Sequence, residues 1–380
     1  MIEKVSKKVK FLAAVIGSLL ITTVSAFGMY GVDGDDWIGF LTDGNQFRAR
    51  MDQLGFTLGN GTIKGTFGFR NDKGTLGSIF SATDNVPATF TPTVSAGLAY
   101  TSEAFGIGVG YNFTYLNQNL QIHTPVLMFN ALNNNLRLAV PIEIAVTDKY
   151  LGTDNHKLTG VSFNNLELRY FTGIDAFNAI RVYFNYRNVT DDNSSYTFGE
   201  KRVSETFGMQ VRLYFLNTQV GNVTVNPFLR VEYHTALRGG SLHDYNMLDL
   251  GNGRVDGIAD GVKQSDVYDA SPYQVVVKPV LSLAASSDIV SLYFEPSLGY
   301  QVNASAARIG EKQVISHSLA WGAYAEMYVT PVEDLEWYFE MDVNNNAAVN
   351  TANVAVTPVY FETTTGITWY LPSFGGDTAQ

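Results

Sequence analysis

The sequence predicts an all-β protein, a closed antiparallel transmembrane β-barrel of about 14 to 16 strands that follows an N-terminal signal peptide. Three observations lead to this fold class. They are an export signal, apolar residues at every second position along segments of membrane length, and connections that alternate between short and long. The periodicity gives about 15 strands, and we favour 16 over 14, because even strand numbers are the rule for such barrels and a weak further strand can be counted.

The first 26 residues have the three parts of a secretory signal peptide. Lysines among the first ten residues precede a mostly apolar run from Phe11 to Thr23, and small residues at 24–26 suit cleavage. The apolar run is too short to cross a hydrocarbon core of about 30 Å as a helix, which needs about 20 residues. We therefore expect residues 1–26 to be removed on export, which leaves residues 27–380 as one barrel domain.

The composition argues against several other classes of protein. The chain has no cysteine, so no disulfide framework and no thiolate metal site are available. Its net charge of -11 makes it a poor nucleic-acid binder, because that affinity comes largely from neutralising phosphates. After the signal peptide, no run of about 18 uninterrupted apolar residues is present to form a membrane helix. The 21 Tyr, 24 Phe and 35 Gly residues suit a barrel with aromatic girdles.

Apolar residues alternate with small or polar ones along most of the chain. Between residues 106 and 116, for example, the apolar set is Ile107, Val109, Tyr111, Phe113 and Tyr115. A period of two is typical of a strand with two different faces. The segments of about 9 to 14 residues exceed the usual strand of a soluble sheet and match what a tilted membrane strand needs.

The connections between these segments also alternate. Short turns are expected near residues 59–61, 102–105, 132–135, 173–178, 216–222, 285–288 and 331–334. Longer connections are expected near 71–92, 148–158, 188–202, 236–270, 302–314 and 344–355, with 117–119 as a short exception. Short periplasmic turns opposite long extracellular loops are typical of outer-membrane barrels. We therefore predict that 236–270 is a long extracellular loop, and its six aspartates suggest a solvated acidic surface.

Residues 37–54 fit two structures. Trp37–Leu41 can form a weak first strand, and counting it favours 16 strands over 14. Phe47, Ala49 and Met51 have the spacing of a strand, whereas Phe47, Met51 and Leu54 have the spacing of a helix. A short helix that lies in the lumen therefore remains the alternative to a strand.

The alternation also assigns charged side chains to the lumen, because Arg or Lys at the lipid midplane costs about 2 to 4 kcal/mol. Arginines concentrate between residues 169 and 230, and acids between 295 and 342, so we expect a field across the lumen. Such charges form a constriction that orients solutes, or they form cross-strand ion pairs that fill a narrow barrel. The candidate lumen or constriction residues are Arg169, Arg181, Arg187, Arg212, Arg230, Glu295, Glu326, Glu336, Glu340 and Asp342.

We expect no enzyme activity, no catalytic residues, no cofactor and no metal site. The pairs Asp154 with His156, Ser241 with His243, and Ser316 with His317 could belong to a membrane hydrolase. Five histidines in a chain of 380 residues produce such neighbours by chance, so a hydrolase is the least favoured hypothesis. Residues 249–253 have only part of the oxygen-ligand pattern of a calcium loop.

Five segments carry a family resemblance. Residues 25–31, 36–42, 44–56, 58–70 and the closing Gly-Ile-Thr-Trp-Tyr-Leu at 366–371 resemble the variable surface proteins of Brachyspira spirochaetes. The resemblance is specific over about the first 70 residues and architectural after them. It implies an abundant, surface-exposed outer-membrane antigen whose loops vary between paralogues, and it brings no catalytic residues. Unlike many outer-membrane barrels, the chain does not end on an aromatic residue, so Trp369, Tyr370 or Phe374 would serve recognition by the assembly machinery.

The sequence therefore predicts a major surface protein of the cell outer membrane with porin-like diffusion of small solutes, since a barrel of about 16 strands leaves an aqueous channel. The alternatives are a non-conducting adhesin or antigen with a plugged lumen, and the hydrolase. Expected partners are outer-membrane lipid, the outer-membrane assembly machinery, host molecules or antibodies, and further copies of the chain in a homo-oligomer. Nucleic acid is not an expected partner.

Overall fold

The computed structural model describes residues 37–50, 53–71, 91–193, 201–252, 255–345 and 359–371. The expected signal peptide lies outside these ranges, as do Phe374 and most of the connections 71–92 and 344–355. No helix in the described ranges is long and apolar enough to cross a membrane.

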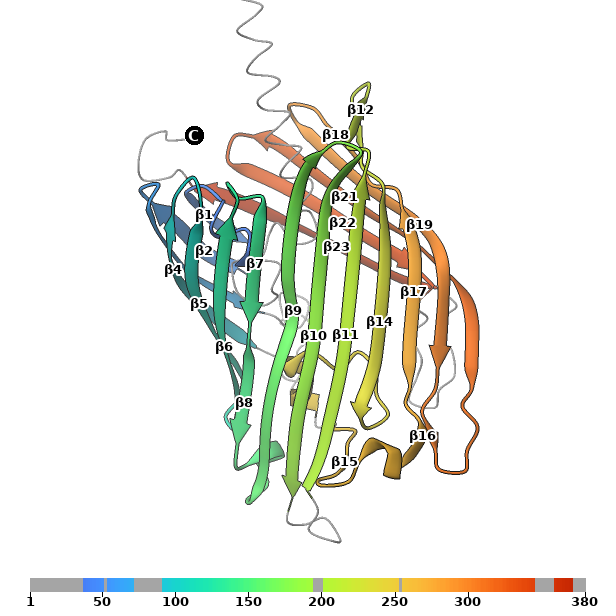
Figure 1. The fold of residues 1–380 in the computed structure, drawn as a ribbon. Coiled ribbons are helices and arrows are strands. Elements are labelled where there is room, and N and C mark those ends of the chain that lie inside the picture. Colours follow the sequence, from blue (N-terminus) through green and yellow to red (C-terminus); the bar gives the residue numbers. More distant parts are fainter. Residues whose placement is uncertain are drawn as a thin grey trace, which may run out of the picture.

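Sixteen antiparallel strands form one closed barrel in the part of the chain that the structure describes (Figure 1). The first eight are β1 (Gln46–Arg50), β2 (Gln53–Gly59), β3 (Ile63–Asn71), β4 (Pro92–Thr101), β5 (Gly106–Asn117), β6 (Leu120–Ala131), a strand interrupted into β7 (Leu136–Pro141) and β8 (Glu143–Thr147), and β9 (His156–Ile174). The others are β10 (Phe177–Asn193), β11 (Lys201–Phe215), β14 (Phe228–Arg238), β17 (Tyr273–Val280), β19 (Val290–Ala304), β21 (Ile315–Val332), β22 (Leu335–Asn344) and β23 (Tyr360–Leu371).

Six short strands complete the set. At the end of the barrel where the short turns lie, β12 (Thr218–Val220), β13 (Val223–Val225) and β18 (Leu283–Ser286) extend β11, β14 and β17. At the opposite end, long connections hold β15 (Ile258–Ala259), β16 (Tyr268–Ala270) and β20 (Ala307–Arg308). Figure 1 shows β12 and β18 at the top of the barrel and β15 and β16 at the bottom. The predicted alternation of short and long connections is therefore confirmed where it is described.

Pairing of the first and last strands closes the barrel. β1 pairs with β2 on one side and with β23 on the other, with Ala49 opposite Trp369 and Arg50 opposite Thr368. All barrel pairings are antiparallel. Because a closed sheet has no edge, every strand of the circle finds hydrogen-bond partners inside the membrane. The predicted fold class is confirmed.

The burial of successive side chains alternates as the sequence predicts. Along β5 the outward Ile107 and Val109 are each 55% exposed, whereas the inward Asn112 is 2% exposed. Large apolar side chains are exposed around the outside on strands from β2 to β23. An apolar outer band of this kind needs lipid rather than water around it.

Tight turns at one end use residues that tolerate a left-handed backbone. Gly61 between β2 and β3 has φ of 85°, and Leu132, Asn133 and Asn134 between β6 and β7 all have positive φ. Such values are uncommon for residues other than glycine, asparagine or aspartate. The short connection expected at 117–119 is also present, because β5 ends at Asn117 and β6 begins at Leu120.

The predicted weak strand at Trp37–Leu41 is wrong. Residues 37–43 form a helical turn inside the barrel, in which the Phe40 amide bonds to the Trp37 carbonyl at 3.1 Å and the Asp43 amide to that of Gly39 at 2.9 Å. The alternative of a lumenal helix is therefore right in kind for this segment. It is wrong for the following residues, where β1 and β2 supply the strands that complete the circle.

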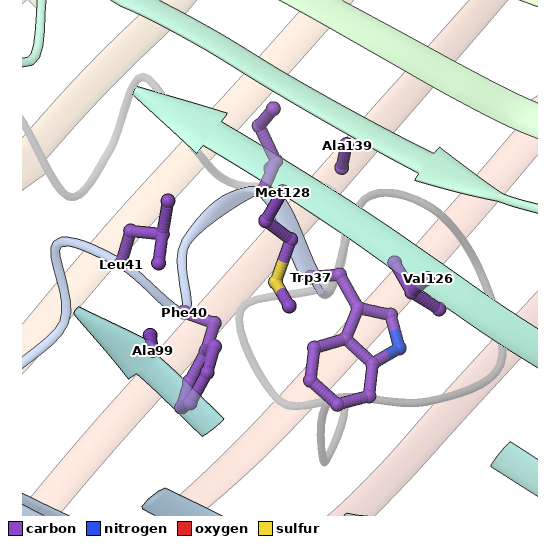
Figure 2. Packing of buried hydrophobic residues seen from close by; sticks show 8 residues of the cluster. Trp37, Phe40, Leu41, Ala99, Val126, Met128 and Ala139 are labelled. Atoms are coloured by element: carbon purple, nitrogen blue, oxygen red, sulfur yellow. The ribbon is translucent and has the colours of Figure 1, made fainter. Parts of the chain in front are cut away.

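The helical turn forms an apolar plug, residues 37–43, against the inner wall of β4 to β7. Trp37 and Phe40 are fully buried and pack edge to face at 5.6 Å. Figure 2 shows them beside Met128 and the other side chains of this cluster. The plug fits because the side chains of the wall are small at this place. A Cβ atom added to Gly110 would lie only 2.6 Å from the Trp37 ring. Glycine in this strand provides the space for a close approach.

Candidate functional site

One row of cations runs around the lumen across six neighbouring strands. Each member lies directly opposite the next in the strand register. Like charges placed directly opposite each other destabilise a sheet, so this row needs compensation. The members of the cation row are Arg137 (β7), Arg169 (β9), Arg181 (β10), Arg212 (β11), Arg230 (β14) and Lys278 (β17).

Aromatic rings compensate part of the cation row. The guanidinium of Arg181 lies 5.0 Å from the centre of the Tyr214 ring, and that of Arg212 lies 4.8 Å from Tyr183. Arginine planes stack favourably on such rings. Arg181 is only 3% exposed, so of the two it is Arg212 that presents a charge to the open lumen.

Carboxylates on the same strands compensate two further members, Arg169 and Arg230. Arg169 donates two hydrogen bonds to Glu167, of which the Nη2–Oε2 bond measures 2.9 Å, and both side chains are buried. Arg230 donates to Glu232, which also accepts a bond from Gln210 at 3.2 Å. Along the cation row, these ion pairs therefore join residues of the same strand and not, as the alternative prediction from the sequence expected, residues of neighbouring strands.

The predicted acidic wall lies on β19, β21 and β22, and tyrosines bind its carboxylates. Glu326 is 3% exposed and accepts bonds from Tyr324 at 2.5 Å and Tyr328 at 2.9 Å. Tyr293 donates to Glu295 in the same way. Phenolic donors let these carboxylates lie close together without a cation beside each one.

The remaining predicted acids occupy the same wall. Glu340 lies opposite Glu326 in the register, and Glu336 accepts a bond from Tyr370 at 3.3 Å. Asp342 accepts one from Asn344 at 3.1 Å. The prediction that acids and arginines line different walls is therefore consistent with the register, although the wall is held by tyrosine and amide donors that the sequence analysis did not single out.

A cavity of about 1090 Å³ lies between the two walls. Arg212, Arg230 and Lys278 reach it from one side, and Glu295 and Asp342 from the other. Four of the ten predicted residues therefore meet in one space, whereas Arg169, Arg181 and Glu326 are buried in the wall. The rest of the lining is rich in amides: Asn164, Asn165, Asn185, Gln210, Gln274, Gln301, Asn303, Asn344 and Asn345.

The long connection after β14 folds back into the lumen. Its residues 245–250 form a lumenal strap that packs on the inner wall of β6, β8 and β9, with Met247 and Leu250 fully buried. The amide of Met247 bonds to Glu143 Oε2 at 3.0 Å, and the Tyr150 hydroxyl bonds to the Leu250 carbonyl at 2.6 Å. The expectation of a wholly solvated acidic loop is therefore wrong for this stretch.

Arg187 holds the lumenal strap instead of lining the cavity. It is 2% exposed, its Nη2 lies 3.3 Å from Asp244 Oδ2, and its Nη1 donates to the Asn246 carbonyl at 3.4 Å. A constriction role for Arg187 is corrected to a positioning role. The alternation of apolar and polar residues correctly placed this side chain in the lumen. It could not show that a loop distant in the sequence folds back into the lumen and covers the side chain.

Two histidines meet where the strap begins. The rings of His234 on β14 and His243 in the connection have centroids 4.2 Å apart, and His234 Nδ1 lies 3.0 Å from the Tyr245 hydroxyl. That hydroxyl donates to the Phe207 carbonyl at 2.8 Å. Desolvation, and then the charge of His234, lower the pKa of His243 to about 4. The docked strap therefore favours a neutral His243.

The residues considered for hydrolysis have other partners. Asp154 forms an exposed ion pair with Lys149 at 3.0 Å, and the buried His156 shares a hydrogen bond of 2.6 Å with Asp191. His317 bonds to Tyr300 at 2.8 Å on the outer face. Among the described residues no cluster of three or more metal-ligating side chains is present.

Two members of the cation row were missed in the sequence, although its alternation contains the signal. Arg137 lies between the outward Leu136 and Leu138, and Lys278 follows the outward Val277. Parity alone therefore places both side chains in the lumen. The amide residues of the cavity follow the same rule, but polar uncharged side chains are too common in the sequence to stand out.

Comparison with known proteins supports the family resemblance that the opening segments of the sequence carry. The model of the Serpulina hyodysenteriae variable surface protein matches residues 8–370. The chain belongs to this family. With its closed barrel and apolar outer face, it is a surface-exposed β-barrel protein of the outer membrane. None of the curated proteins compared with the chain matches it.

Several solved structures are similar to the chain at low sequence identity. A bacterial polysaccharide outer membrane secretin has a TM-score of 0.46 and 8% identity, with 87% of this chain and 99% of that one covered. The FrpB iron transporter from Neisseria meningitidis has a TM-score of 0.41 and 10% identity, covering 90% and 76%. OmpT of Vibrio cholerae has a TM-score of 0.36 and 8% identity, covering 85% and 97%.

Proposed function

We propose that this surface protein also acts as a porin-like channel for the passive diffusion of small polar solutes. The observation that carries the proposal is the cavity of about 1090 Å³ with opposite charges on its two walls. A barrel of about 16 strands is wide enough to leave an aqueous path. Charged and amide side chains along that path replace part of the hydration of a solute and so lower the barrier to its passage.

The transverse charge separation supports diffusion more than plugging. If the charges only filled a narrow barrel, Lys278 would pair with an acid of the opposite wall. In the described part of the chain no ion pair joins Lys278 to Glu295 or Asp342, and the space between them is the cavity. Opposite charges held apart in a wet space make a local field that a solute experiences.

A plugged, non-conducting surface antigen is the second candidate. The apolar plug and the lumenal strap favour it, because together they fill the lumen along β4 to β10. In this case the cavity would be a closed pocket instead of part of a path. The two candidates make opposite predictions for ion conduction.

Planar bilayers decide between them. Purified wild-type protein should give discrete conductance steps, and replacing Arg212 and Arg230 together by Gln should raise cation preference, measured as the reversal potential in a salt gradient. Lys201→Gln is the matched control, because this exposed lysine pairs with Asp192 at 3.8 Å away from the cavity. Absence of conductance from correctly folded protein would remove the porin proposal and favour the plugged antigen.

The orientation in the membrane is part of the same proposal. The long connections face the cell exterior and the short turns the periplasm, as is typical of outer-membrane barrels. The chain has no cysteine, so a single introduced thiol reports its own location. A membrane-impermeant maleimide should label Asp154→Cys on intact cells and Asp175→Cys only after permeabilisation. The opposite result would invert the orientation. Host molecules, antibodies and further copies of the chain as partners remain predictions.

A further inference from the structure

The cavity holds unpaired charges of both signs. Lys278 has no hydrogen-bond or ion-pair partner among the described residues, and the cavity gives it solvent access. Across the space, and within the part of the chain that the structure describes, Asp342 accepts a side-chain hydrogen bond only from Asn344, and Glu295 only from Tyr293. A partly buried charge without a partner is costly, so each of these groups favours a ligand that brings the opposite charge.

Both walls act on the same small volume. Lys278 interacts electrostatically with Arg230 and Glu232 on its own wall, and with Asp342 across the cavity. Because Arg230 and Glu232 form an ion pair with each other, Lys278 and Arg212 provide the net positive charge of this wall. A simple anion would be attracted by one wall and repelled by the other, and a simple cation likewise. A solute that carries both charges gains from both walls at once.

Amides supply the rest of the chemistry of the cavity. Asn and Gln side chains donate and accept hydrogen bonds at once, which is what a peptide bond also does. Nine such side chains line the space, among them Gln274 and Asn303, which bond to each other at 2.7 Å. Two tyrosines also line the space, and their hydroxyls already donate to the Phe207 carbonyl and to Glu326: these are Tyr245 and Tyr324.

We propose that the cavity is a binding site for small zwitterions, namely amino acids and short peptides with both termini charged. The carboxylate binds at Lys278 and Arg212, and the ammonium group binds at Asp342 and Glu295. The volume of about 1090 Å³ lies slightly above the roughly 300 to 1,000 Å³ that small-molecule sites occupy, which leaves room for a short peptide. The inference rests on the proposed function, because diffusing solutes must reach this cavity.

Four forms of one dipeptide test the inference in the wild-type protein. Alanyl-alanine carries both charges, its N-acetyl form only the carboxylate, its amide only the ammonium group, and the doubly capped form neither. Calorimetric titration of the folded protein in detergent should show alanyl-alanine binding at least about tenfold more tightly than each capped form, because each cap leaves one wall unpaired. Equal affinities for the four forms would overturn the inference.

Two variants assign the charges to their walls. Lys278→Gln should bring alanyl-alanine down to the affinity of its amide, and Asp342→Asn should bring it down to that of its N-acetyl form. Lys201→Gln, at an exposed site outside the cavity, should change nothing. If Lys278→Gln folds and binds alanyl-alanine like the wild type, the assignment fails.

Conductance of the same preparations separates the two proposals. A conducting protein without preference for the zwitterion would overturn the binding site and leave the porin function standing. A protein that binds the zwitterion selectively but does not conduct would uphold the site as a closed receptor pocket and remove the porin function. Selective binding together with conductance supports both.

Discussion

The two sides of the lumen differ, although the outer surface of the barrel is the same all around. Along β4 to β6 the inner wall carries glycine and other small residues, and the plug of residues 37–43 fills the space. Along β11 to β22 the inner wall carries charges and amides, and the space stays open. Lipid imposes one chemistry on the outer face, whereas the inner positions are free to specialise. Function therefore has to be sought on the inward-facing half of each strand.

The first prediction tests whether the two sides share the same outer face. Val211 on β11 and Phe339 on β22 are outward neighbours of the inward Arg212 and Glu340. Val211→Arg and Phe339→Arg should each cost about 2 to 4 kcal/mol near the bilayer midplane and impair assembly. The measurement is the fraction of protein that remains folded and heat-modifiable on unboiled gels.

The matched controls lie one residue along each strand. Arg212→Gln and Glu340→Gln should assemble nearly as well as the wild type, because a shift of one residue moves a side chain from lipid to lumen. Normal assembly of both arginine variants would mean that positions 211 and 339 do not face lipid. The conclusion that both sides of the barrel share a lipid-facing outer surface would then be wrong.

The second prediction concerns the filled side. A side chain at Gly110 would collide with Trp37, since an added Cβ lies 2.6 Å from its ring. Gly110→Val should cost about 1 to 3 kcal/mol through overpacking and displace the plug without opening the barrel. A cysteine at Leu41, which is 5% exposed in the wild type, reports displacement through its rate of maleimide labelling.

Gly65→Val is the control for this change. Its added Cβ would find only ordinary contacts, the nearest being Leu98 Cδ2 at 3.7 Å on the outer face. Labelling of Leu41→Cys should rise in the Gly110→Val background and stay slow with Gly65→Val. Slow labelling in both would show that the plug does not depend on the glycine surface, and the filled side would need another explanation.

The sequence predicted the circle of strands but not the contents of the lumen. The alternation of apolar and polar residues predicts that Arg212 and Asp342 point inward. Every strand has the same period of two residues, because one of its faces contacts lipid. The plug and the lumenal strap have no such periodic pattern, because Trp37 and Met247 are buried by contacts with residues far away in the sequence. The Trp37–Leu41 segment was therefore mistaken for a strand, and Arg187 for a constriction residue. The small residues opposite Trp37, such as Gly97 and Gly110, were the available signal.

The lumenal strap lies between the two sides, and the histidines at its beginning, His234 and His243, predict how firmly it stays there. His243 packs against His234, and Glu232 lies 3.7 Å from His234 on the same wall. Nearby, Asp244 pairs with Arg187. The pKa of His243 is lowered from 6.5 to about 4, first by desolvation and then by His234. An undocked strap would return His243 to its ordinary pKa.

The sign of the pH dependence follows from this difference. A group whose pKa is lowered in the docked state binds more protons when undocked, so docking weakens as the pH falls. Docking should therefore be unaffected above about pH 6.5 and weaken progressively toward about pH 4. Because the side chain of His243 is exposed to solvent, screening should make the effect smaller than that of either substitution above.

Spin labels measure the strap without depending on conduction. Labels on Asp249→Cys in the strap region and Thr218→Cys at the opposite end should give one distance at pH 7.5 and a second, growing population toward pH 4. His243→Gln should remove that pH response, whereas His317→Gln on the outer face should keep it, because His317 contacts Tyr300 and not the strap. If His243→Gln retains the full response, protonation of another group releases the strap. If neither pH nor His243→Gln changes the distance, the strap is a fixed part of the wall, and the filled side of the lumen extends permanently to the cavity.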